Sequence, residues 1–166
     1  EEVWEYKDRL PLVQKLGKAG YDGRGVQILR SEEDFSKAFD EPGLLENLIP
    51  FEKELAVLVA RNAQNDIITY PIVEMVFHPE QNLVEYLFAP AEISLEIAEE
   101  AQNLAKTVVK ELNYVGIMAI ELFLTPEKQL LVNELAPRPH NSGHHTIRAC
   151  SASQYEQHLR AILGLP

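Results

Sequence analysis

Cysteine is almost absent from this sequence, because Cys150 is the only one in 166 residues. A single thiol excludes an internal disulfide, which agrees with a reducing compartment. Apolar runs near the roughly 20 residues of a membrane span are absent as well, and the segment Glu1-Glu2-Val3-Trp4-Glu5 lacks the basic and apolar regions of a signal peptide. We therefore expect a cytoplasmic, globular protein with no membrane partner.

Positive charge is also scarce. The sequence has 15 Lys and Arg residues against 26 Asp and Glu residues, a formal net charge of −11. Nucleic-acid binding needs a basic face that displaces counterions, so a general nucleic-acid partner is excluded. A small anionic ligand remains compatible where cations gather locally, as Lys15, Lys18 and Arg24 do near the start and Arg138 does near the end.

The hydrophobic content of 46% supports a real core, and the order of elements predicts an α+β fold. In residues 1–48 we expect a short helix and then strands over 10–15 and 26–29, which form a hairpin around a glycine-rich turn. A helix over 32–39 follows, because Ser31 and Asp34 fit a capping box. We assign these residues to a small lobe and residues 49–166 to a larger one.

Strand patterns dominate the next part of the chain. They predict an antiparallel meander with strands over 44–48, 54–61, 67–77 and 83–88. Apolar residues at helical spacing then predict the longest helix, between Ser94 and Asn113. The larger lobe is completed by strands over 116–124 and 129–135 and by a last helix over 153–163.

The most informative segment runs from Asn133 to Thr146 and has the sequence NELAPRPHNSGHHT. It gathers a carboxylate, an arginine, three histidines and hydrogen-bonding side chains between two prolines and a glycine. An apolar run precedes it and a helical pattern follows it, so these groups lie at the end of a strand and in the loop beyond. Loops held by such a scaffold commonly carry function, and we interpret this one as part of a site.

The hairpin formed by the last two predicted strands indicates a metal site. A tight turn centred between Glu127 and Lys128 places Glu121 opposite Glu134, on one face. Like charges that face each other in this way are destabilising, and a divalent cation offsets the repulsion. Mg²⁺ is commonly held by one or two carboxylates together with phosphates and water. Two alternatives stay open: a register shifted by one residue with both glutamates solvated, or a carboxyl pair that shares a proton.

Two further segments are weaker signals. The glycines of the run from Gly20 to Gly25 free backbone N–H groups to approach an anion, and Lys15 supplies a point charge suited to phosphate. A glycine-rich hairpin more often simply turns. Three glutamates lie between Leu45 and Glu54, at the predicted lobe junction, where they could bind ribose hydroxyls or form a solvated face.

Taken together, these motifs resemble those of the ATP-grasp enzymes. More narrowly, GYDGRG, APRPHNSGH and SQYEQHLRA are similar to the 5-(carboxyamino)imidazole ribonucleotide synthase branch of that superfamily. The resemblance implies an ATP-grasp fold, with two lobes that have antiparallel sheets and packed helices. It also implies ATP and Mg²⁺ as cofactors, and bicarbonate and 5-aminoimidazole ribonucleotide as small-molecule substrates in purine biosynthesis.

The resemblance also implies roles for individual positions. ATP contacts are implied for Lys15, Gly20, Tyr21, Asp22, Gly23, Arg24, Gly25, Val26, Glu46, Asn47, Leu48, Ile49, Glu54, His78, Asn133 and Glu134. Mg²⁺ ligation is implied for Glu121 and Glu134. Catalytic roles are implied for Arg138, His140, Asn141, Tyr21 and Asp22, and substrate contacts for the same five residues and Ser142.

The implied reaction is phosphoryl transfer from ATP to bicarbonate, which gives carboxyphosphate, followed by transfer of its carboxyl group to the amine of 5-aminoimidazole ribonucleotide. Members of this branch have another domain before the ATP-grasp portion and continue beyond it. We therefore expect this chain to be inactive alone. As a separate expectation, the full-length protein is a homodimer. Two other functions stay open: another ATP-grasp ligase that joins a carboxylate to an amine, and a non-catalytic nucleotide-binding module.

Overall fold

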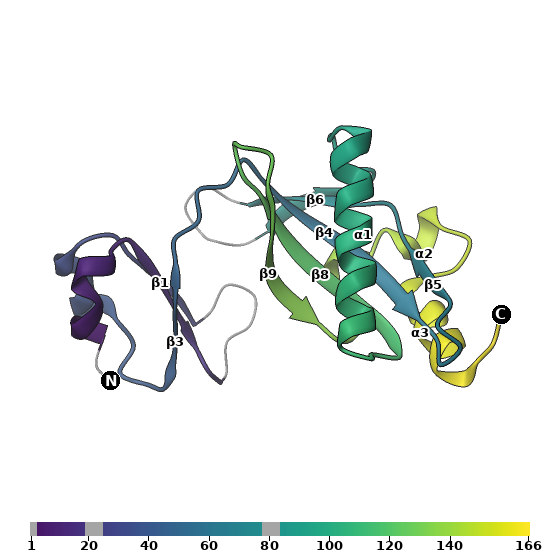
Figure 1. The fold of residues 1–166 in the computed structure, drawn as a ribbon, viewed down its shortest axis with the longest axis horizontal. Coiled ribbons are helices and arrows are strands. Elements are labelled where there is room, and N and C mark those ends of the chain that lie inside the picture. Colours follow the sequence, from purple (N-terminus) through teal and green to yellow (C-terminus); the bar gives the residue numbers. More distant parts are fainter. Residues whose placement is uncertain (1–2, 19–24, 78–83) are drawn as a thin grey trace. The chain divides into compact units, whose positions relative to one another are not determined.

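The computed structural model describes residues 3–18, 25–77 and 84–166 and divides into two compact units (Figure 1). Unit 1 comprises the described residues up to Pro50, and unit 2 comprises those from Phe51 onward. This division lies close to the predicted limit of the small lobe at residue 48. Both units combine strands with helices, so the predicted α+β class is confirmed.

Unit 1 is built around a three-stranded sheet of order β2-β1-β3. Its elements, with η for a 3₁₀ helix, are η1 (Val3–Arg9), β1 (Leu12–Leu16), β2 (Val26–Leu29), η2 (Glu32–Lys37) and β3 (Gly43–Asn47). The predicted hairpin is confirmed, because β1 and β2 pair in antiparallel register. The strand over 44–48 was expected to be the first strand of the antiparallel meander, and this expectation is wrong. β3 instead pairs with the open edge of β1, whose backbone groups need partners.

Three buried apolar side chains, Leu12, Leu29 and Phe35, form the core of unit 1 among the described residues. The ring of Trp4 in η1 packs on Phe35, with the ring centroids 4.7 Å apart. One strand pair and two short helices therefore share a very small apolar centre.

The buried side chain of Gln14 supports this core through both ends of its amide. Nε2 donates to the carbonyl oxygen of Phe39 at 3.0 Å, and Oε1 accepts from the N–H of Phe39 at 2.8 Å. A buried polar group is normally paired in this way. The contact fixes the connection between η2 and β3 to the middle of β1.

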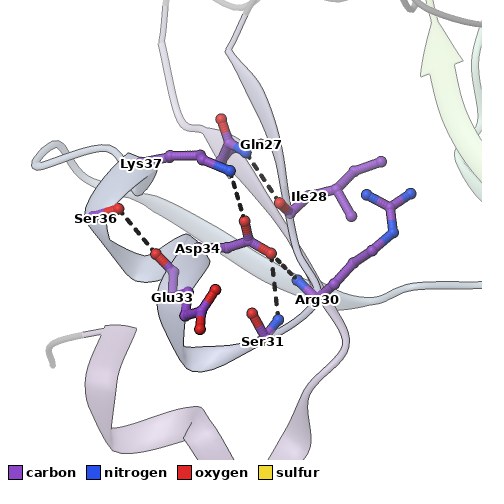
Figure 2. Close-up of polar contacts among 8 residues, drawn as sticks. All are labelled: Gln27, Ile28, Arg30, Ser31, Glu33, Asp34, Ser36 and Lys37. Carbon is purple, nitrogen blue, oxygen red and sulfur yellow. Dashed lines mark hydrogen bonds and ion pairs between the residues drawn. The ribbon is translucent and has the colours of Figure 1, made fainter.

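The predicted cap of η2 is present (Figure 2). Asp34 Oδ2 accepts from the N–H of Arg30 at 2.9 Å and from that of Ser31 at 3.3 Å, and Oδ1 binds Lys37 Nζ at 2.8 Å. The hydrogen bond from Lys37 and then that from Arg30 lower the pKa of Asp34 from 3.8 to about 2. The helix itself is shorter than predicted, because it is a 3₁₀ helix that ends at Lys37.

Unit 2 is built around a six-stranded antiparallel sheet of order β7-β6-β4-β8-β9, with β5 paired to β4. Its elements are β4 (Lys53–Arg61), β5 (Ile67–Thr69), β6 (Val73–Phe77), β7 (Val84–Phe88), α1 (Leu95–Glu111), β8 (Gly116–Leu124), β9 (Leu130–Ala136), η3 (Asn141–Gly143), α2 (Thr146–Ala149) and α3 (Gln154–Leu163).

The predicted meander is wrong in two details. The strand expected over 67–77 is divided into β5 and β6, because Pro71 has no N–H with which to continue the ladder. The strand order is not sequential either, since β4 lies between β6 and β8. The helix α1 connects β7, at one edge of the sheet, to β8, which lies beyond β4 in the strand order.

The longest predicted helix is confirmed as α1. The hydroxyl of Ser94 accepts from the N–H of Ile97 at 3.3 Å, which satisfies one of the free donors at the start of the helix. The buried residues Ile97, Ala101, Ala105 and Val109 recur at helical spacing. This stripe packs against the strands of the sheet, and Figure 1 shows α1 lying across one face of that sheet. No helix in the described parts of the chain is long and apolar enough to cross a membrane.

The two faces of the unit 2 sheet hold different side chains. Because side chains alternate along a strand, Leu55 and Val57 of β4 join the core under α1. Ala56 and Leu58 of the same strand belong to a second buried cluster on the other face. That second face also carries the glutamates that were predicted to bind ligands.

Candidate functional site

Three glutamates from neighbouring strands lie on the sheet face opposite α1. Glu54 of β4 is nearly buried, with 8% of its surface exposed. Glu121 of β8 pairs with Ala56, two positions along β4 from Glu54, and Glu134 of β9 lies directly opposite Glu121. Because residues two apart on a strand point to the same side, the three carboxylates share this face.

The predicted pairing of Glu121 with Glu134 is confirmed, but the register from which it was derived is partly wrong. Near the turn, Leu122 pairs with Val132, which is one residue from the partner that the predicted turn gives. A bulge between Glu121 and Leu122 then adds Asn133 to β9 and restores the predicted pair. Without this bulge, Glu121 would face Asn133. Bulges often redirect a side chain next to a functional site.

The error in register comes from the turn. Thr125 N donates to Gln129 O at 2.9 Å, which centres the turn on Glu127 and not between Glu127 and Lys128. Lys128 has a left-handed backbone with φ 64°. Three-residue hairpin loops commonly end in a residue of this conformation, and no local signal in the sequence marks a lysine for it.

His140 brings the segment after β9 to the same carboxylates. Its Nε2 lies 3.6 Å from Glu121 Oε1. Its Nδ1 lies 3.0 Å from Ser142 Oγ and accepts from Ser142 N at 3.4 Å. In a neutral ring, an accepting Nδ1 leaves the proton on Nε2, the atom that faces Glu121. The structure therefore brings together the predicted site residues Glu121, His140 and Ser142.

Two side chains outside the predicted site connect β8 with the elements that follow it. The hydroxyl of Tyr114 lies 2.9 Å from Pro137 O and 3.1 Å from Ile117 O, and burial raises the pKa of Tyr114. The Nδ1 of His158 in α3 accepts from Ile117 N at 3.0 Å. In the sequence alone, His158 is a lone histidine to which no role can be assigned. In the structure it makes a hydrogen bond that supports the fold.

The remaining predicted residues of this segment are nearer to solvent. Arg138 is exposed, and its Nη1 donates to Pro139 O at 3.0 Å. Asn141 begins η3 and is also exposed. Asn133, the extra residue of the bulge, is half-buried. A guanidinium and an amide are thus presented on the loop that also holds His140.

Unit 1 contains the predicted phosphate lysine in an ion pair. Lys15 Nζ lies 2.7 Å from Glu46 Oε2. Lys15 pairs with Leu44, so Glu46, two residues along β3, is on the same face. Nearby, Asn47 Oδ1 accepts from Arg9 Nη2 at 3.4 Å. Two residues predicted to contact ATP, Lys15 and Glu46, are therefore in direct contact.

The glycine-rich loop is described only at its end. Gly25 has φ 78°, a backbone conformation that glycine adopts without steric cost, and its carbonyl oxygen accepts from Leu16 N at 2.8 Å. Val26 pairs with Lys15. The predicted site residues Gly20, Tyr21, Asp22, Gly23, Arg24 and His78 lie outside the described residues. Leu48 and Ile49 are described and half-buried.

The donors on the carboxylate face fit Mg²⁺. Glu121 and Glu134 offer oxygen atoms from directly opposed positions, and Mg²⁺ usually takes one or two protein carboxylates while phosphate oxygens and water complete its octahedron. Within the described ranges, no group of three or more His, Cys, Asp or Glu side chains is arranged to hold a metal ion. The arrangement therefore suits an ion whose remaining ligands come from a bound phosphate.

Comparisons with known proteins identify the family of the chain. The family model of the ATP-grasp domain matches residues 4–155. The N5-carboxyaminoimidazole ribonucleotide synthase of Bacillus subtilis (strain 168) is 44% identical over 162 residues, which cover 95% of this chain and 42% of that protein.

Two solved structures from Aspergillus clavatus are also similar. Carboxyaminoimidazole ribonucleotide synthase complexed with ATP is 36% identical with a TM-score of 0.91, over 98% of this chain and 44% of that chain. N5-carboxyaminoimidazole synthase in complex with ADP and 5-aminoimidazole ribonucleotide is 35% identical with a TM-score of 0.84, over 95% and 41%.

The chain thus spans about two-fifths of the length of these relatives, and the family model covers nearly all of it. The predicted ATP-grasp fold is confirmed by the same matches. The chain therefore belongs to the ATP-grasp family.

Proposed function

We propose that this chain provides the ATP-grasp portion of an enzyme that carboxylates 5-aminoimidazole ribonucleotide with bicarbonate and ATP in purine biosynthesis. The names of the relatives and the ligands in the Aspergillus clavatus structures support the proposal. Within the chain, the main support is the pairing of Glu121 with Glu134. Two opposed carboxylates repel each other unless a proton or a cation lies between them, and a cation is what phosphoryl transfer requires.

The reaction would proceed in two transfers. An oxygen of bicarbonate attacks the terminal phosphorus of ATP, and the bond from that phosphorus to the bridging oxygen breaks, which gives ADP and carboxyphosphate. The amine of 5-aminoimidazole ribonucleotide then attacks the carboxyl carbon, loses a proton and releases inorganic phosphate. Mg²⁺, when bound, supplies positive charge that neutralises the transferring phosphoryl group.

Unit 2 would provide the metal and substrate contacts. Glu121 and Glu134 are proposed as the Mg²⁺ ligands, and Glu54 as the acceptor for ribose hydroxyls. Arg138 is proposed to bind a carboxylate or phosphate through two parallel hydrogen bonds, which the planar guanidinium allows and a lysine does not. His140 with its Nε2 proton, Asn141 and Ser142 would contact bicarbonate and the imidazole ribonucleotide.

Unit 1 would provide phosphate and adenine contacts. Lys15 is proposed to contact the ATP phosphates, and the pair with Glu46 holds its ammonium group in place. The backbone of the glycine-rich loop is proposed to bind phosphate as well, and Glu46, Asn47, Leu48 and Ile49 to receive the adenine. Tyr21, Asp22 and His78 are proposed to lie near the substrates. We further propose a cytoplasmic setting and a homodimeric full-length protein.

The metal proposal is tested by removing one negative charge at a time. Glu121→Gln and Glu134→Gln should each weaken Mg²⁺-dependent ATP binding about tenfold or more. Even the mutation of a residue that only hydrogen-bonds to a metal ligand commonly lowers metal affinity about 10–100-fold. Isothermal titration calorimetry of ATP with and without Mg²⁺ measures this. Glu127→Gln is the matched control, because it removes the same charge from the exposed turn of the same hairpin and should leave the affinity unchanged.

If neither Glu121→Gln nor Glu134→Gln alters Mg²⁺-dependent ATP binding, the metal site is wrong. The substrate is tested separately, by phosphate release from a full-length protein that contains this chain. Phosphate release should need both bicarbonate and 5-aminoimidazole ribonucleotide. Another ATP-grasp ligase would not need this pair of substrates. Steady ADP release by this chain alone, dependent on the aminoimidazole, would contradict our expectation that the chain is inactive by itself.

A further inference from the structure

Gln154, the first residue of α3, is fully buried and bonds both backbone groups of His140. Its Oε1 accepts from His140 N at 2.9 Å, and its Nε2 donates to His140 O at 2.8 Å. A side-chain amide has both a donor and an acceptor, so it can satisfy one residue's backbone completely. The backbone of His140 is therefore fixed from a helix that begins 14 residues later in the chain.

Gln154 is itself held in place by its surroundings. Its backbone N–H donates to Thr146 Oγ1 at 2.9 Å, and that hydroxyl donates to Gly143 O at 2.6 Å. A Cβ at Gly143 would come within 2.3 Å of Gln154 Oε1, so only glycine leaves room for the amide. Contacts of this kind restrict a side chain to one rotamer.

The orientation of the His140 imidazole follows from these contacts. His140 has an extended backbone (φ −135°, ψ 158°), and the bonds to Gln154 hold it there. Its Nδ1 then meets Ser142, and its Nε2 lies 3.6 Å from Glu121. A shift of about 1 Å at such a point can cost a site much of its activity.

We infer that Gln154 is a positioning residue, which fixes the backbone of His140 and thereby directs the imidazole Nε2 toward Glu121. The inference rests on the proposed function, because His140 and Glu121 are proposed site residues. Gln154 was not among the residues predicted from the sequence. One signal in the sequence could have indicated its burial. Gln154 lies seven residues, about two helical turns, before Ala161, so the two residues share one side of the last helix, and that side is buried.

The first test changes Gln154 to glutamate in this chain. Gln154→Glu keeps the shape and the acceptor for His140 N, but it puts a carboxylate oxygen against the carbonyl oxygen of His140. Imidazole ¹⁵N NMR, at a pH that keeps the ring neutral, should show His140 as the Nε2–H tautomer in the unchanged chain. The variant should lose this single-tautomer signature.

Gln14→Glu is the matched control, because Gln14 makes the same two bonds to Phe39 in unit 1. It should destabilise unit 1 and leave the His140 ring signals unchanged. Ring signals of His140 that are the same in Gln154→Glu as in the unchanged chain would overturn the inference. Ring signals that change equally in Gln14→Glu would overturn it too, since the effect would then be unspecific.

The second test asks whether Gln154 acts through His140. Gln154→Glu should weaken Mg²⁺-dependent ATP binding by about tenfold. This is the low end of the loss of affinity that follows mutation of residues that orient metal ligands. In a His140→Ala background the same change should cause no further loss, because coupled residues are not additive. An equal loss in both backgrounds would overturn the inference.

A variant that does not fold leaves a measurement on the unchanged chain. The N–H of His140 is bonded to a buried oxygen, so it should exchange with solvent far more slowly than that of exposed His144. Equal exchange rates for His140 and His144 would overturn the inference. If the unchanged chain does not bind Mg²⁺-ATP, the proposed function fails, whereas the ring and exchange measurements still decide the role of Gln154.

Discussion

Unit 1 and unit 2 differ most in the amount of apolar surface that they bury. Among the described residues, unit 1 has a core of Leu12, Leu29 and Phe35, whereas unit 2 has two large clusters, one on each face of its sheet. A small unit buries a smaller share of its surface and is correspondingly marginal. Polar contacts should therefore matter more for the stability of unit 1 than for that of unit 2.

The two buried glutamines sharpen this difference. Gln14 and Gln154 each bond both backbone groups of one residue. In unit 1 the bonded residue is Phe39, in a connection next to the small core. In unit 2 it is His140, a proposed site residue on a unit that already has a large core. The same contact thus lies next to a small core in one unit and holds the backbone of a proposed site residue in the other.

The largest expected effect is that of Phe35→Ala. Truncating a buried phenylalanine typically costs about 3–5 kcal/mol, which is comparable to the whole stability of a marginal unit. Amide NMR spectra should lose the dispersed signals of unit 1 and keep those of unit 2.

Leu44→Ala is the control for this change, because Leu44 lies in the same unit and is 49% exposed. Its effect should stay within about 0.5 kcal/mol. Loss of the unit 2 signals in Phe35→Ala would show that the large core does not make unit 2 independent, and the comparison would fail.

An intermediate effect is expected for Tyr70 of unit 2 in alkali. Burial, followed by the charges of Cys150 and Glu156, raises the pKa of Tyr70 from 10 to about 12, and its hydroxyl donates to Ala152 O at 3.0 Å. The protonated phenol is the form that the folded state favours. The stabilisation is therefore complete below pH 10 and is lost as the pH rises from 10 toward 12.

This loss is measured by chemical denaturation at several alkaline pH values. Unfolding of unit 2 is monitored by far-UV circular dichroism. Tyr70→Phe should be less stable at neutral pH and should show a shallower decline between pH 10 and 12. Parallel declines in the variant and the unchanged chain would assign the alkaline sensitivity to other groups.

The smallest effect is expected for Asp34 of unit 1 in acid, because this carboxylate lies at the surface, where solvent weakens its contacts. Its pKa is lowered from 3.8 to about 2 by the hydrogen bonds from Lys37 and Arg30. Its stabilisation is therefore present above pH 3.8 and is lost as the pH falls toward 2.

Asp34→Asn should reduce this acid dependence, measured from the amide signals of unit 1 between pH 4.5 and 2. Unit 2 signals serve as the internal reference in the same spectra. If acid affects unit 1 in Asp34→Asn as steeply as in the unchanged chain, the cap of η2 does not contribute to the difference between the units.

Elements with local signals could be predicted from the sequence. α1 was predicted because the apolar residues of its stripe recur at helical spacing within one stretch of chain. The strand β8 was predicted with the observed bounds for the same reason. α3 shows the limit of such patterns: its apolar residues Tyr155 and Leu159 are about half exposed, whereas Gln154 is buried.

The candidate site could be predicted only in part. Glu121 and Glu134 were paired correctly, although the turn is centred on Glu127 and the bulge at Asn133 compensates for the error. A bulge depends on the packing of two strands together, so neither strand alone indicates it. The contact of Gln154 with His140 joins two segments that no periodicity relates.

By itself the sequence determined the class of the fold, the main helices and strands, the family resemblance and the residue types of the site. Only the tertiary structure decided that β3 pairs with β1, that Asn133 forms a bulge and that Gln154 is buried against His140. The reason is physical. Helix caps and hydrophobic periods depend on neighbours along the chain, whereas pairing, register and burial depend on which distant segments satisfy one another's hydrogen bonds and exclude water.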